Sequence, residues 1–398
     1  MKILIITYWK ETNPGTFLQA YGVQFGLRKI FPTADIKYLN YTNAVKETDL
    51  SNKAHNDAEL LYDNLTFIQK VKHVCALIKR RNLFLQCQKK CMSFDKQKFN
   101  MYQSEEENIN FTLYENQFDL IVIGSDTIIE SCNINGLWGV MWPNLQVRTN
   151  KMFFAASADS AINLQNKPEL YAELRNRTND FVQIGLRDYV TINFFINQLN
   201  ISSDRILKQP DPTFYLPLSI FSISEKKIKK IPNGKQKIIF YHFDRCFKYR
   251  KALANMLRKQ GFYLITSEYD PNCDYSLRSL TPFEWAALFQ YCDFVLTERF
   301  HDTVFAMRYK IPVITIDWRL RVMNNKMESK RLSILKDFDC SENHCVINSE
   351  SDLHNVMDKL FEIGGNNYHE KITRKVEEMT NEANICLDKL KDKLIHNS

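Results

Sequence analysis

Long apolar runs are absent from this sequence. No segment approaches the roughly 18 consecutive apolar residues that a membrane-spanning helix needs. The apolar run Met1–Tyr8 is too short for a signal peptide, and the charged Lys10 and Glu11 follow soon after it. We therefore expect a protein that works in the cytoplasm.

Paired cysteines are absent as well. The ten cysteines, among them Cys75, Cys87, Cys91, Cys132 and Cys292, never form a Cys-x-x-Cys pair. This pattern argues against a disulfide framework and against a zinc site. Neither metal-ligand spacing nor a cluster of His and Cys indicates any other metal. We expect reduced thiols and no bound metal.

The sequence also lacks a Gly-x-Gly-x-x-Gly fingerprint, a Walker-type loop and any internal repeat. A dinucleotide or ATP site is therefore not expected. The composition, with 44% hydrophobic and 25% charged residues, is ordinary for a folded protein. The formal net charge of +7 fits anionic substrates, a membrane surface or nucleic acid equally well.

Apolar segments of strand length alternate with segments of helical periodicity in both halves of the chain. Strands are expected at residues 2–8, 36–41, 118–123, 152–156, 182–186, 237–242, 262–266, 294–296 and 312–316. Helices are expected at residues 16–30, 65–99, 249–260, 281–291, 304–309, 329–338, 351–363 and 368–395, and a loop at residues 43–64. This alternation predicts an α/β protein of two doubly wound Rossmann-like domains that face each other across a cleft.

A chain of 398 residues is longer than the chains that usually fold around a single hydrophobic core, so two domains are expected. We place an N-terminal α/β domain at residues 1–212, a C-terminal α/β domain at residues 213–365 and a C-terminal helix at residues 366–398. The sequence Asp211-Pro212-Thr213 makes a turn that fits a passage between the two domains.

Residues 65–99 predict a long basic helix or helix pair, in which apolar residues recur at helical spacing and lysines and arginines occupy other positions. A basic amphipathic helix can lie on an anionic membrane. It can equally pack against its own domain and expose a solvated charged face.

The stretch Asp293–Asp317 predicts a strand, a polar loop at residues 297–303, a helix and a second strand. Ligands of open parallel sheets bind at the carboxyl ends of the strands, where Glu298, Arg299 and His301 stand. A guanidinium that grips phosphate or carboxylate, beside an imidazole that moves a proton near neutral pH, suits an anionic substrate. The alternative is an Arg/Glu ion pair and a structural His at a helix start.

Three other strand ends carry candidate residues. Gly15, in a turn before a helix, can let a ligand approach the backbone amides of the helix N-terminus. Ser125 and Asp126 can hold hydroxyl groups or cap a helix. Arg187 can clamp a phosphate or carboxylate, or form a salt bridge. His242, at a further strand end, can face the cleft or be a satisfied turn residue.

Together, five motifs resemble the signature of the polysaccharide pyruvyl transferase family, in the family's order and over most of the chain. They are Ile5-Ile-Thr-Tyr8 with Asn13-Pro-Gly-Thr-Phe-Leu-Gln-Ala-Tyr21, Phe118-Asp-Leu-Ile-Val-Ile-Gly-Ser-Asp126, Gly185-Leu-Arg-Asp188, Pro210-Asp-Pro-Thr213, and Thr297-Glu-Arg-Phe-His-Asp-Thr303 with Lys310-Ile-Pro-Val-Ile314. Two departures stand out. Asp302 replaces a glycine, and Thr127 to Glu130 replace a segment that more often carries an aromatic residue.

The resemblance implies a GT-B-like pair of domains that transfers pyruvate from phosphoenolpyruvate to a sugar of a cell-surface polysaccharide precursor, forming a ketal without a further cofactor. His301 is then the candidate general acid or base, and Arg299 a second catalytic residue. Arg187, Arg299 and Gly15 are candidates for donor binding. The candidates for acceptor binding are Ser125, Asp126, Glu298 and Asp302.

The expected acceptor is a nucleotide sugar or a lipid-linked oligosaccharide, and the second would bring the protein to the inner face of the membrane. Nucleic acid is not an expected partner. One alternative is a glycosyltransferase of the same shape, in which Arg299 and nearby amides hold a nucleotide diphosphate. Another is a non-catalytic member of a polysaccharide assembly complex, in which Asp302 disfavours turnover.

Overall fold

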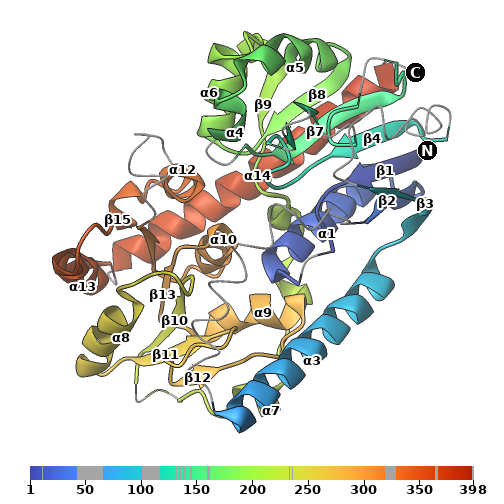
Figure 1. The fold of residues 1–398 in the computed structure, drawn as a ribbon. Helices are drawn as coiled ribbons and strands as arrows, with labels where there is room; N and C mark the ends of the chain where they lie inside the picture. The colour runs from blue at the N-terminus through green and yellow to red at the C-terminus, as the bar shows by residue number, and fades with distance from the viewer. Residues whose placement is uncertain are drawn as a thin grey trace.

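The computed structural model describes residues 1–10, 12–42, 66–100, 117–130, 132–133, 136–137, 140–143, 146–158, 162–232, 234, 236–318, 329–363 and 366–396. The loop expected at residues 43–64 lies outside this set. Two parallel sheets, each with its own helices, form an N-terminal lobe and a C-terminal lobe (Figure 1).

The N-terminal lobe is built on a sheet whose seven described strands run parallel in the order β3-β2-β1-β4-β7-β8-β9. They are β1 (Lys2–Ile6), β2 (Asp35–Thr42), β3 (Phe94–Asn100), β4 (Leu120–Ile123), β7 (Asn150–Ala156), β8 (Phe181–Leu186) and β9 (Ile206–Lys208). The short strands β5 (Cys132–Asn133) and β6 (Gly136–Leu137) pair separately. Apart from Lys2, the side chains of β1 and β4 are buried on both faces, as is typical of continuous apolar strands in a covered parallel sheet.

The C-terminal lobe is built on six described parallel strands in the order β12-β11-β10-β13-β14-β15. They are β10 (Ile238–His242), β11 (Tyr263–Thr266), β12 (Tyr275–Ser276), β13 (Phe294–Thr297), β14 (Val313–Asp317) and β15 (His344–Val346). The strand order reverses between β10 and β13, as it does between β1 and β4 in the other lobe. The predicted pair of doubly wound α/β domains is therefore confirmed.

Most of the predicted helices begin and end close to the predicted positions, whereas the helices at residues 162–165, 171–177, 189–197 and 225–228 were not predicted. Twelve α-helices lie in the described part of the chain. They are α1 (Pro14–Ile30), α3 (Phe67–Cys91), α4 (Ile162–Gln165), α5 (Tyr171–Arg177), α6 (Tyr189–Asn197), α7 (Glu225–Ile228), α8 (Arg250–Lys259), α9 (Pro282–Leu288), α10 (Phe300–Arg308), α12 (Lys330–Asp337), α13 (Leu353–Glu362) and α14 (Asn366–His396). Thr281, the first residue of the helix expected at residues 281–291, caps α9 through a capping box with Glu284.

The prediction of a continuous helix or helix pair over residues 65–99 is wrong at its C-terminal end. The helix α3 ends at Cys91, and Phe94–Asn100 form β3, which pairs in parallel with β2 at the edge of the sheet. Pairing with a neighbouring strand decides the conformation of this lysine-rich segment against its local preference.

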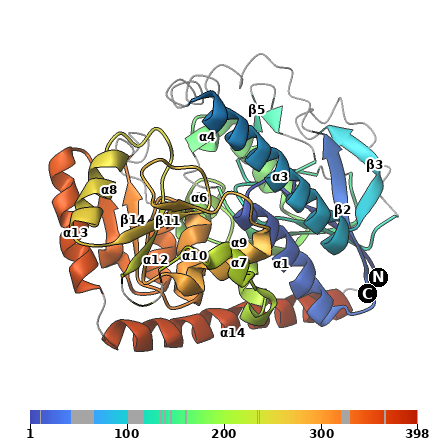
Figure 2. The ribbon, with the colours of Figure 1, turned by 90° about the horizontal axis from the view of Figure 1, so that it is seen from below.

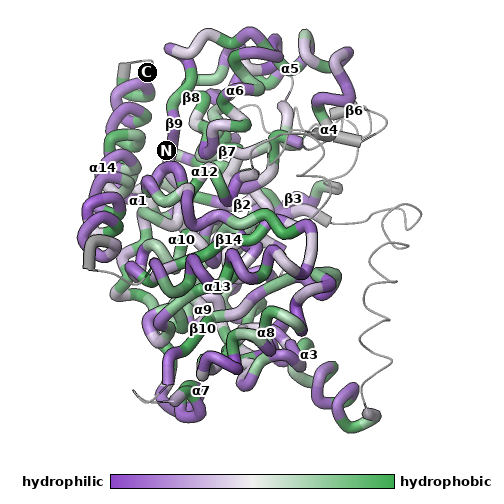
Figure 3. The backbone as a smooth tube through the Cα atoms, turned by 90° about the vertical axis from the view of Figure 1, so that its left-hand side faces the viewer, coloured by the Kyte–Doolittle hydropathy of each residue, from purple (hydrophilic) through white to green (hydrophobic). Residues whose placement is uncertain are grey.

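The helix α14 runs along one side of the molecule and α3 along another (Figure 2). Apolar and polar residues alternate along α14 at helical spacing (Figure 3), and its buried positions include Ile372, Ala383 and Leu390. It returns from the C-terminal lobe to the N-terminal lobe, where the Tyr215 hydroxyl donates to the Ala383 carbonyl at 2.9 Å. The limits proposed above for the domains stay a prediction.

Candidate functional site

A cleft of about 1180 Å³ lies between the two lobes. Its walls come from the segments that follow β1, β4 and β8 in one lobe and β10, β11 and β13 in the other, together with one side of α3. In both sheets, this places the cleft at the carboxyl ends of the strands beside the point where the strand order reverses. That is where open α/β sheets bind ligands.

The cleft is rich in positive charge. Nine lysines and arginines stand among the described residues that line it, against four carboxylates. The cations are Lys10, Arg80, Arg81, Arg187, Arg245, Arg278, Arg299, Lys330 and Arg331, and the acids are Asp126, Glu268, Glu298 and Asp302. A cleft with this balance concentrates anionic ligands.

The sequence predicted a polar loop at residues 297–303, but α10 already begins at Phe300. The strand-to-helix turn is short because the Thr297 hydroxyl accepts a hydrogen bond from the Arg299 amide at 2.9 Å. His301 and Asp302 therefore lie in the first turn of a helix, where their positions are fixed by the backbone.

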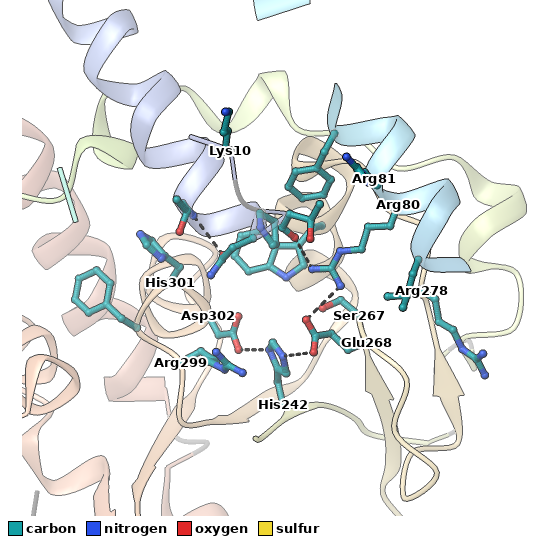
Figure 4. Close-up of a pocket in the computed structure, with 18 of the residues that line it drawn as sticks. Lys10, Arg80, Arg81, His242, Ser267, Glu268, Arg278, Arg299, His301 and Asp302 are labelled. Atoms are coloured by element: carbon teal, nitrogen blue, oxygen red, sulfur yellow. Dashed lines mark hydrogen bonds and ion pairs between the residues drawn. The ribbon is translucent and has the colours of Figure 1, made fainter. Parts of the chain in front are cut away.

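The register of β10 and β13 places His242 beside Thr297. Asp302 reaches both residues: its Oδ2 lies 2.7 Å from His242 Nδ1 and accepts a hydrogen bond from the Thr297 hydroxyl at 2.7 Å. On the other side of the ring, His242 Nε2 is 3.8 Å from Glu268 Oε2, and Arg80 of α3 contacts Glu268 at 3.2 Å (Figure 4). The residue that departs from the family pattern, Asp302, thus anchors a row of alternating charges.

This row decides the charge of His242. Burial disfavours its imidazolium form, but Asp302 and Glu268 outweigh burial and raise the pKa of His242 to about 10. Burial likewise opposes ionisation of Glu268, but His242, Arg80 and Arg299 hold the pKa of Glu268 well below its usual range. At neutral pH, His242 is therefore a fixed cation in the cleft wall.

His301 crosses to the N-terminal lobe. Its Nε2 lies 3.2 Å from the Gln19 side-chain oxygen and 3.7 Å from Asp211 Oδ2. Arg187 donates to the same Asp211 oxygen at 2.9 Å, and its guanidinium stacks over the Phe300 ring at 4.2 Å. One constellation thus joins Arg187, which directly follows β8, with residues of α1 and α10 and with Asp211.

Two carboxylates of the N-terminal lobe are held ionised by this constellation. Burial opposes ionisation of Asp211, but His301 and Arg187 keep the pKa of Asp211 well below its usual range. Burial also opposes ionisation of Asp126, but Lys330, Arg187 and His301 lower its pKa. Asp126 lines the cleft wall, where its Oδ2 accepts hydrogen bonds from the Gln19 side chain at 2.6 Å and the Thr16 hydroxyl at 3.3 Å, and its Oδ1 accepts from the Thr127 amide at 2.9 Å.

Several buried donors in the cleft have no hydrogen-bond partner among the described residues. Among them are Nε and Nη2 of Arg187 and Nε of Arg299, as well as Ser267 Oγ, Trp285 Nε1 and Arg331 Nε. A buried donor without a partner destabilises the protein by about 1–3 kcal/mol, and by more when it is charged. Nε and Nη2 of a guanidinium form the fork that binds a phosphate or carboxylate through two hydrogen bonds.

Gly15 has a structural role that the sequence did not predict. A Cβ atom at this position would lie 2.3 Å from Cγ of His301, so the imidazole occupies the space beside the glycine. The amides of Gly15 and Thr16 donate to the Asn13 side chain at 3.0 and 3.3 Å. Gly15 thus seats His301, while donor binding by Gly15 stays a prediction.

The four predicted acceptor residues differ in their positions. Ser125 is fully buried, and its hydroxyl donates to the Ala155 carbonyl at 2.7 Å, so it lies beneath the cleft wall. Glu298 lines the cleft, but its carboxylate accepts from the Asp244 amide at 2.7 Å and from the Trp318 indole. Asp126 and Asp302 line the cleft as well.

Sequence reasoning missed three members of the site. Asp211 and Gln19 stood inside the quoted motifs, but the Asp-Pro-Thr segment predicted only a turn between domains, and Gln19 received no role. Glu268 has no motif that would single it out, since it reaches His242 from the segment after β11. In the part of the chain that the structure describes, no group of three or more His, Cys, Asp or Glu is arranged to hold a metal ion.

The fold has relatives among solved structures. UDP-GlcNAc 2-epimerase from Neisseria meningitidis, bound to UDP-GlcNAc, is 13% identical with a TM-score of 0.58, over 98% of this chain and 99% of that one. UGT89C1 from Arabidopsis thaliana, complexed with quercetin, is 10% identical with a TM-score of 0.54, over 99% of both chains. UDP-GlcNAc 2-epimerase from Methanocaldococcus jannaschii, in complex with UDP-GlcNAc and UDP, is 11% identical with a TM-score of 0.51, over 95% of this chain and 100% of that one.

At these identities the likeness shows the fold alone, which is GT-B-like with two Rossmann-like domains. No curated protein is similar enough in sequence to match the chain. A model of the polysaccharide pyruvyl transferase family, by contrast, matches residues 13–319. That span contains the cleft residues Arg187, Arg299 and His301 together with Gln19 and Asp211, which contact His301, and the chain belongs to the polysaccharide pyruvyl transferase family.

Proposed function

We propose that this protein transfers the pyruvyl group of phosphoenolpyruvate to two hydroxyls of a sugar in a cell-surface polysaccharide precursor, forming a ketal. Family membership indicates a transferase that modifies polysaccharides. The donor and the ketal are supported chiefly by one observation, the buried guanidinium donors of Arg187 and Arg299 that have no partner among the described residues. Phosphoenolpyruvate supplies a phosphate and a carboxylate, one anion for each guanidinium.

The reaction needs two proton transfers and the loss of one phosphate group. The methylene carbon of phosphoenolpyruvate gains a proton and becomes a methyl group, and a sugar hydroxyl forms a bond to the neighbouring carbon. Phosphate leaves from that carbon, and a second hydroxyl closes the ketal there. Of the two hydroxyl protons released, one balances the methyl group and the other leaves with phosphate.

His301 is the residue that moves protons in this scheme. Its Nε2 faces Gln19 and Asp211, which hold the ring in place, and the ring stands in the cleft wall. A positioned imidazole contributes about 10²–10⁴-fold to rate. Arg299, with the fixed imidazolium of His242 nearby, stabilises the negative charge that develops on the departing phosphate.

The acceptor binds on the side of the N-terminal lobe. Asp126 faces the cleft there and is ionised, so it accepts hydrogen bonds from sugar hydroxyls. The remaining cations of the cleft suit an acceptor that carries phosphate, as a nucleotide sugar or a lipid-linked oligosaccharide does. Similar structures have been solved with UDP-GlcNAc or UDP bound, which supports a sugar diphosphate in this cleft.

The same bound nucleotides favour a second candidate, a glycosyltransferase in which Arg299 and nearby amides hold a nucleotide diphosphate. Phosphate release separates the two functions. We expect release from phosphoenolpyruvate only when a sugar acceptor is present, and no consumption of a nucleotide sugar as donor.

The test compares the intact protein with His301→Gln and Arg299→Gln. Loss of one charge-stabilising donor lowers kcat by about 10²–10³-fold. Exposed His369→Gln and Arg374→Gln on α14 are the matched controls, and they should release phosphate at the normal rate. Equal activity of the site variants and the controls would contradict the proposed roles, and turnover of a nucleotide sugar as donor would favour the second candidate.

A further inference from the structure

The helix α3 (Phe67–Cys91) exposes an unusual number of large apolar side chains. Seven of them are between 42% and 81% exposed: Phe67, Ile68, Val71, Val74, Leu77, Ile78 and Leu85. Phe67, Val71, Val74, Ile78 and Leu85 follow one another at spacings of three, four and seven residues, so they form one stripe along the helix. Each side chain of this stripe is at least 42% exposed.

The charge of α3 has one sign. Its 25 residues contain seven lysines and arginines and neither aspartate nor glutamate. The cations are Lys70, Lys72, Lys79, Arg80, Arg81, Lys89 and Lys90. A helix that merely exposes a solvated face normally carries charges of both signs. An exposed apolar stripe between cations is instead the pattern of a helix that lies in the surface of an anionic bilayer.

Contacts on another side of the helix fix the orientation of α3. Gln88 donates to the Trp9 carbonyl at 2.7 Å, the Phe84 ring lies 6.3 Å from the Phe17 ring, and Arg80 pairs with Glu268 of the C-terminal lobe. These contacts hold the inner side of the helix against both lobes. The helix lies along the outside of the molecule (Figure 2), and the side chains of the stripe are exposed.

The stripe joins the mouth of the cleft. Leu77 and Leu85 are both exposed on α3 and part of the cleft wall, beside the cations Arg80 and Arg81. A surface that holds α3 therefore also holds the cleft opening close to it. None of the described helices is long and apolar enough to cross a bilayer.

We propose that α3 is a membrane-docking helix, which inserts its apolar stripe between the headgroups of an anionic bilayer and places the cleft mouth at the lipid surface. A second copy of this chain is a less suitable partner to cover the stripe. Two stripes in two-fold contact would bring two sets of seven cations together without an acidic partner on either helix. Lipid phosphates neutralise these charges instead.

This docking does not depend on the reaction in the cleft. Where the proposed function also holds, it favours the lipid-linked acceptor over the soluble nucleotide sugar, because the sugar of a lipid-linked acceptor projects from the bilayer at the height of the cleft mouth. That last step rests on the proposed function.

The test is vesicle flotation of the full chain, without phosphoenolpyruvate or acceptor, so that failure of the proposed reaction does not affect it. We expect binding to vesicles of phosphatidylglycerol and phosphatidylcholine, weakened by salt, and little binding to phosphatidylcholine alone. A Lys70→Gln/Lys72→Gln/Lys79→Gln variant should bind about 100-fold more weakly, because each of the three lysines contributes the binding free energy that is typical of a lysine near an anionic surface. A Phe67→Ser/Val71→Ser/Ile78→Ser variant should lose binding to a similar degree.

Matched controls keep the test specific. Lys226→Gln/Lys229→Gln/Lys251→Gln removes three exposed charges outside α3, and Phe361→Ser removes an exposed aromatic residue outside α3. These variants should float like the intact protein, and circular dichroism should show that all variants are folded. Equal binding of the α3 variants and the controls, or no binding of the intact protein to anionic vesicles, would overturn the proposal. So would a dimer in sedimentation that the serine variant converts to monomer.

Discussion

Asp302 and His242 form a buried ion pair in the cleft wall, and this pair links protonation to stability. The pKa of His242 is about 10 in the folded protein, against an ordinary value of 6.5. A group whose pKa is raised on folding contributes its full stabilisation at pH values below its pKa in the unfolded protein. This stabilisation is lost as the pH rises through its pKa in the folded protein. The stabilisation by His242 should therefore disappear between pH 6.5 and pH 10.

We predict that His242→Gln lowers the free energy of unfolding by about 3 kcal/mol at pH 7, because it removes the positive charge that pairs with the buried Asp302 carboxylate. The difference from the intact protein should shrink as the pH approaches 10. Denaturant unfolding at a series of pH values measures it, with the exposed His369→Gln as control. A difference that stays constant over this range would show that His242 is not the titrating group.

The close packing of Gly15 against the His301 ring leads to a second prediction about a single residue. Gly15→Ala would place a methyl group 2.3 Å from the His301 ring and push the ring out of its position between Gln19 and Asp211. Because small misplacements of a catalytic group lower rates strongly, we expect kcat to fall about 10²-fold.

The matched control for that prediction is Gly26→Ala in the same helix, where the added methyl group meets the Tyr215 ring far from the cleft. This control should affect stability and leave kcat unchanged. If Gly15→Ala and Gly26→Ala behave alike in kinetics, Gly15 does not seat the catalytic ring.

At the scale of elements, Glu298 joins two segments of the C-terminal lobe. Its carboxylate accepts from the Asp244 amide after β10 and from the Trp318 indole after β14. We predict that Glu298→Gln destabilises the protein by about 1–3 kcal/mol, because one of the two donors loses its acceptor. Thermal unfolding together with steady-state kinetics tests this. A higher KM for the acceptor with unchanged stability would instead support the acceptor-binding role predicted from the sequence.

The sequence predicted well those elements in which local pattern and tertiary structure agree. Apolar runs such as Leu120–Ile123 predicted buried strands, and the helix expected at residues 281–291 starts within one residue of α9. It failed where long-range pairing decides, as in Phe94–Asn100, which become a strand only because β2 lies beside them. It also missed the start of α10 at Phe300, which depends on a hydrogen bond of the Thr297 side chain.

The site was predictable to a similar degree. Carboxyl ends of parallel strands share one edge, so Arg187, Arg299 and His301 were expected near one cleft, and the structure places them there. The partners of these residues were not predictable. Asp211 and Glu268 reach the site through a turn and a loop whose paths follow from the packing of both lobes.

At the scale of the whole molecule, the cleft is held together by contacts between the lobes. His301 reaches Gln19 and Asp211 of the N-terminal lobe, and Arg80 of α3 reaches Glu268 of the C-terminal lobe. A ligand that satisfies Arg187 in one lobe and Arg299 in the other should therefore stabilise the entire protein.

We predict that phosphoenolpyruvate at 100 times its Kd stabilises the protein by about 2.7 kcal/mol and raises the apparent Tm. Pyruvate, which lacks the phosphate, should have a much smaller effect at the same concentration. Differential scanning fluorimetry measures both shifts, and Arg299→Gln should remove most of the shift by phosphoenolpyruvate. An equal shift in intact protein and Arg299→Gln would place the donor elsewhere.

The most direct measurement follows the carbon that the proposed reaction transforms. The protein is incubated with a sugar acceptor and with phosphoenolpyruvate labelled with carbon-13 at the carbon that bears the phosphate, and the products are examined by NMR. We predict that the label moves into a carbon bonded to two sugar oxygens, a carboxylate and a methyl group. Label that stays in phosphoenolpyruvate, or that leaves as free pyruvate with every acceptor, would contradict ketal transfer as the function of this cleft.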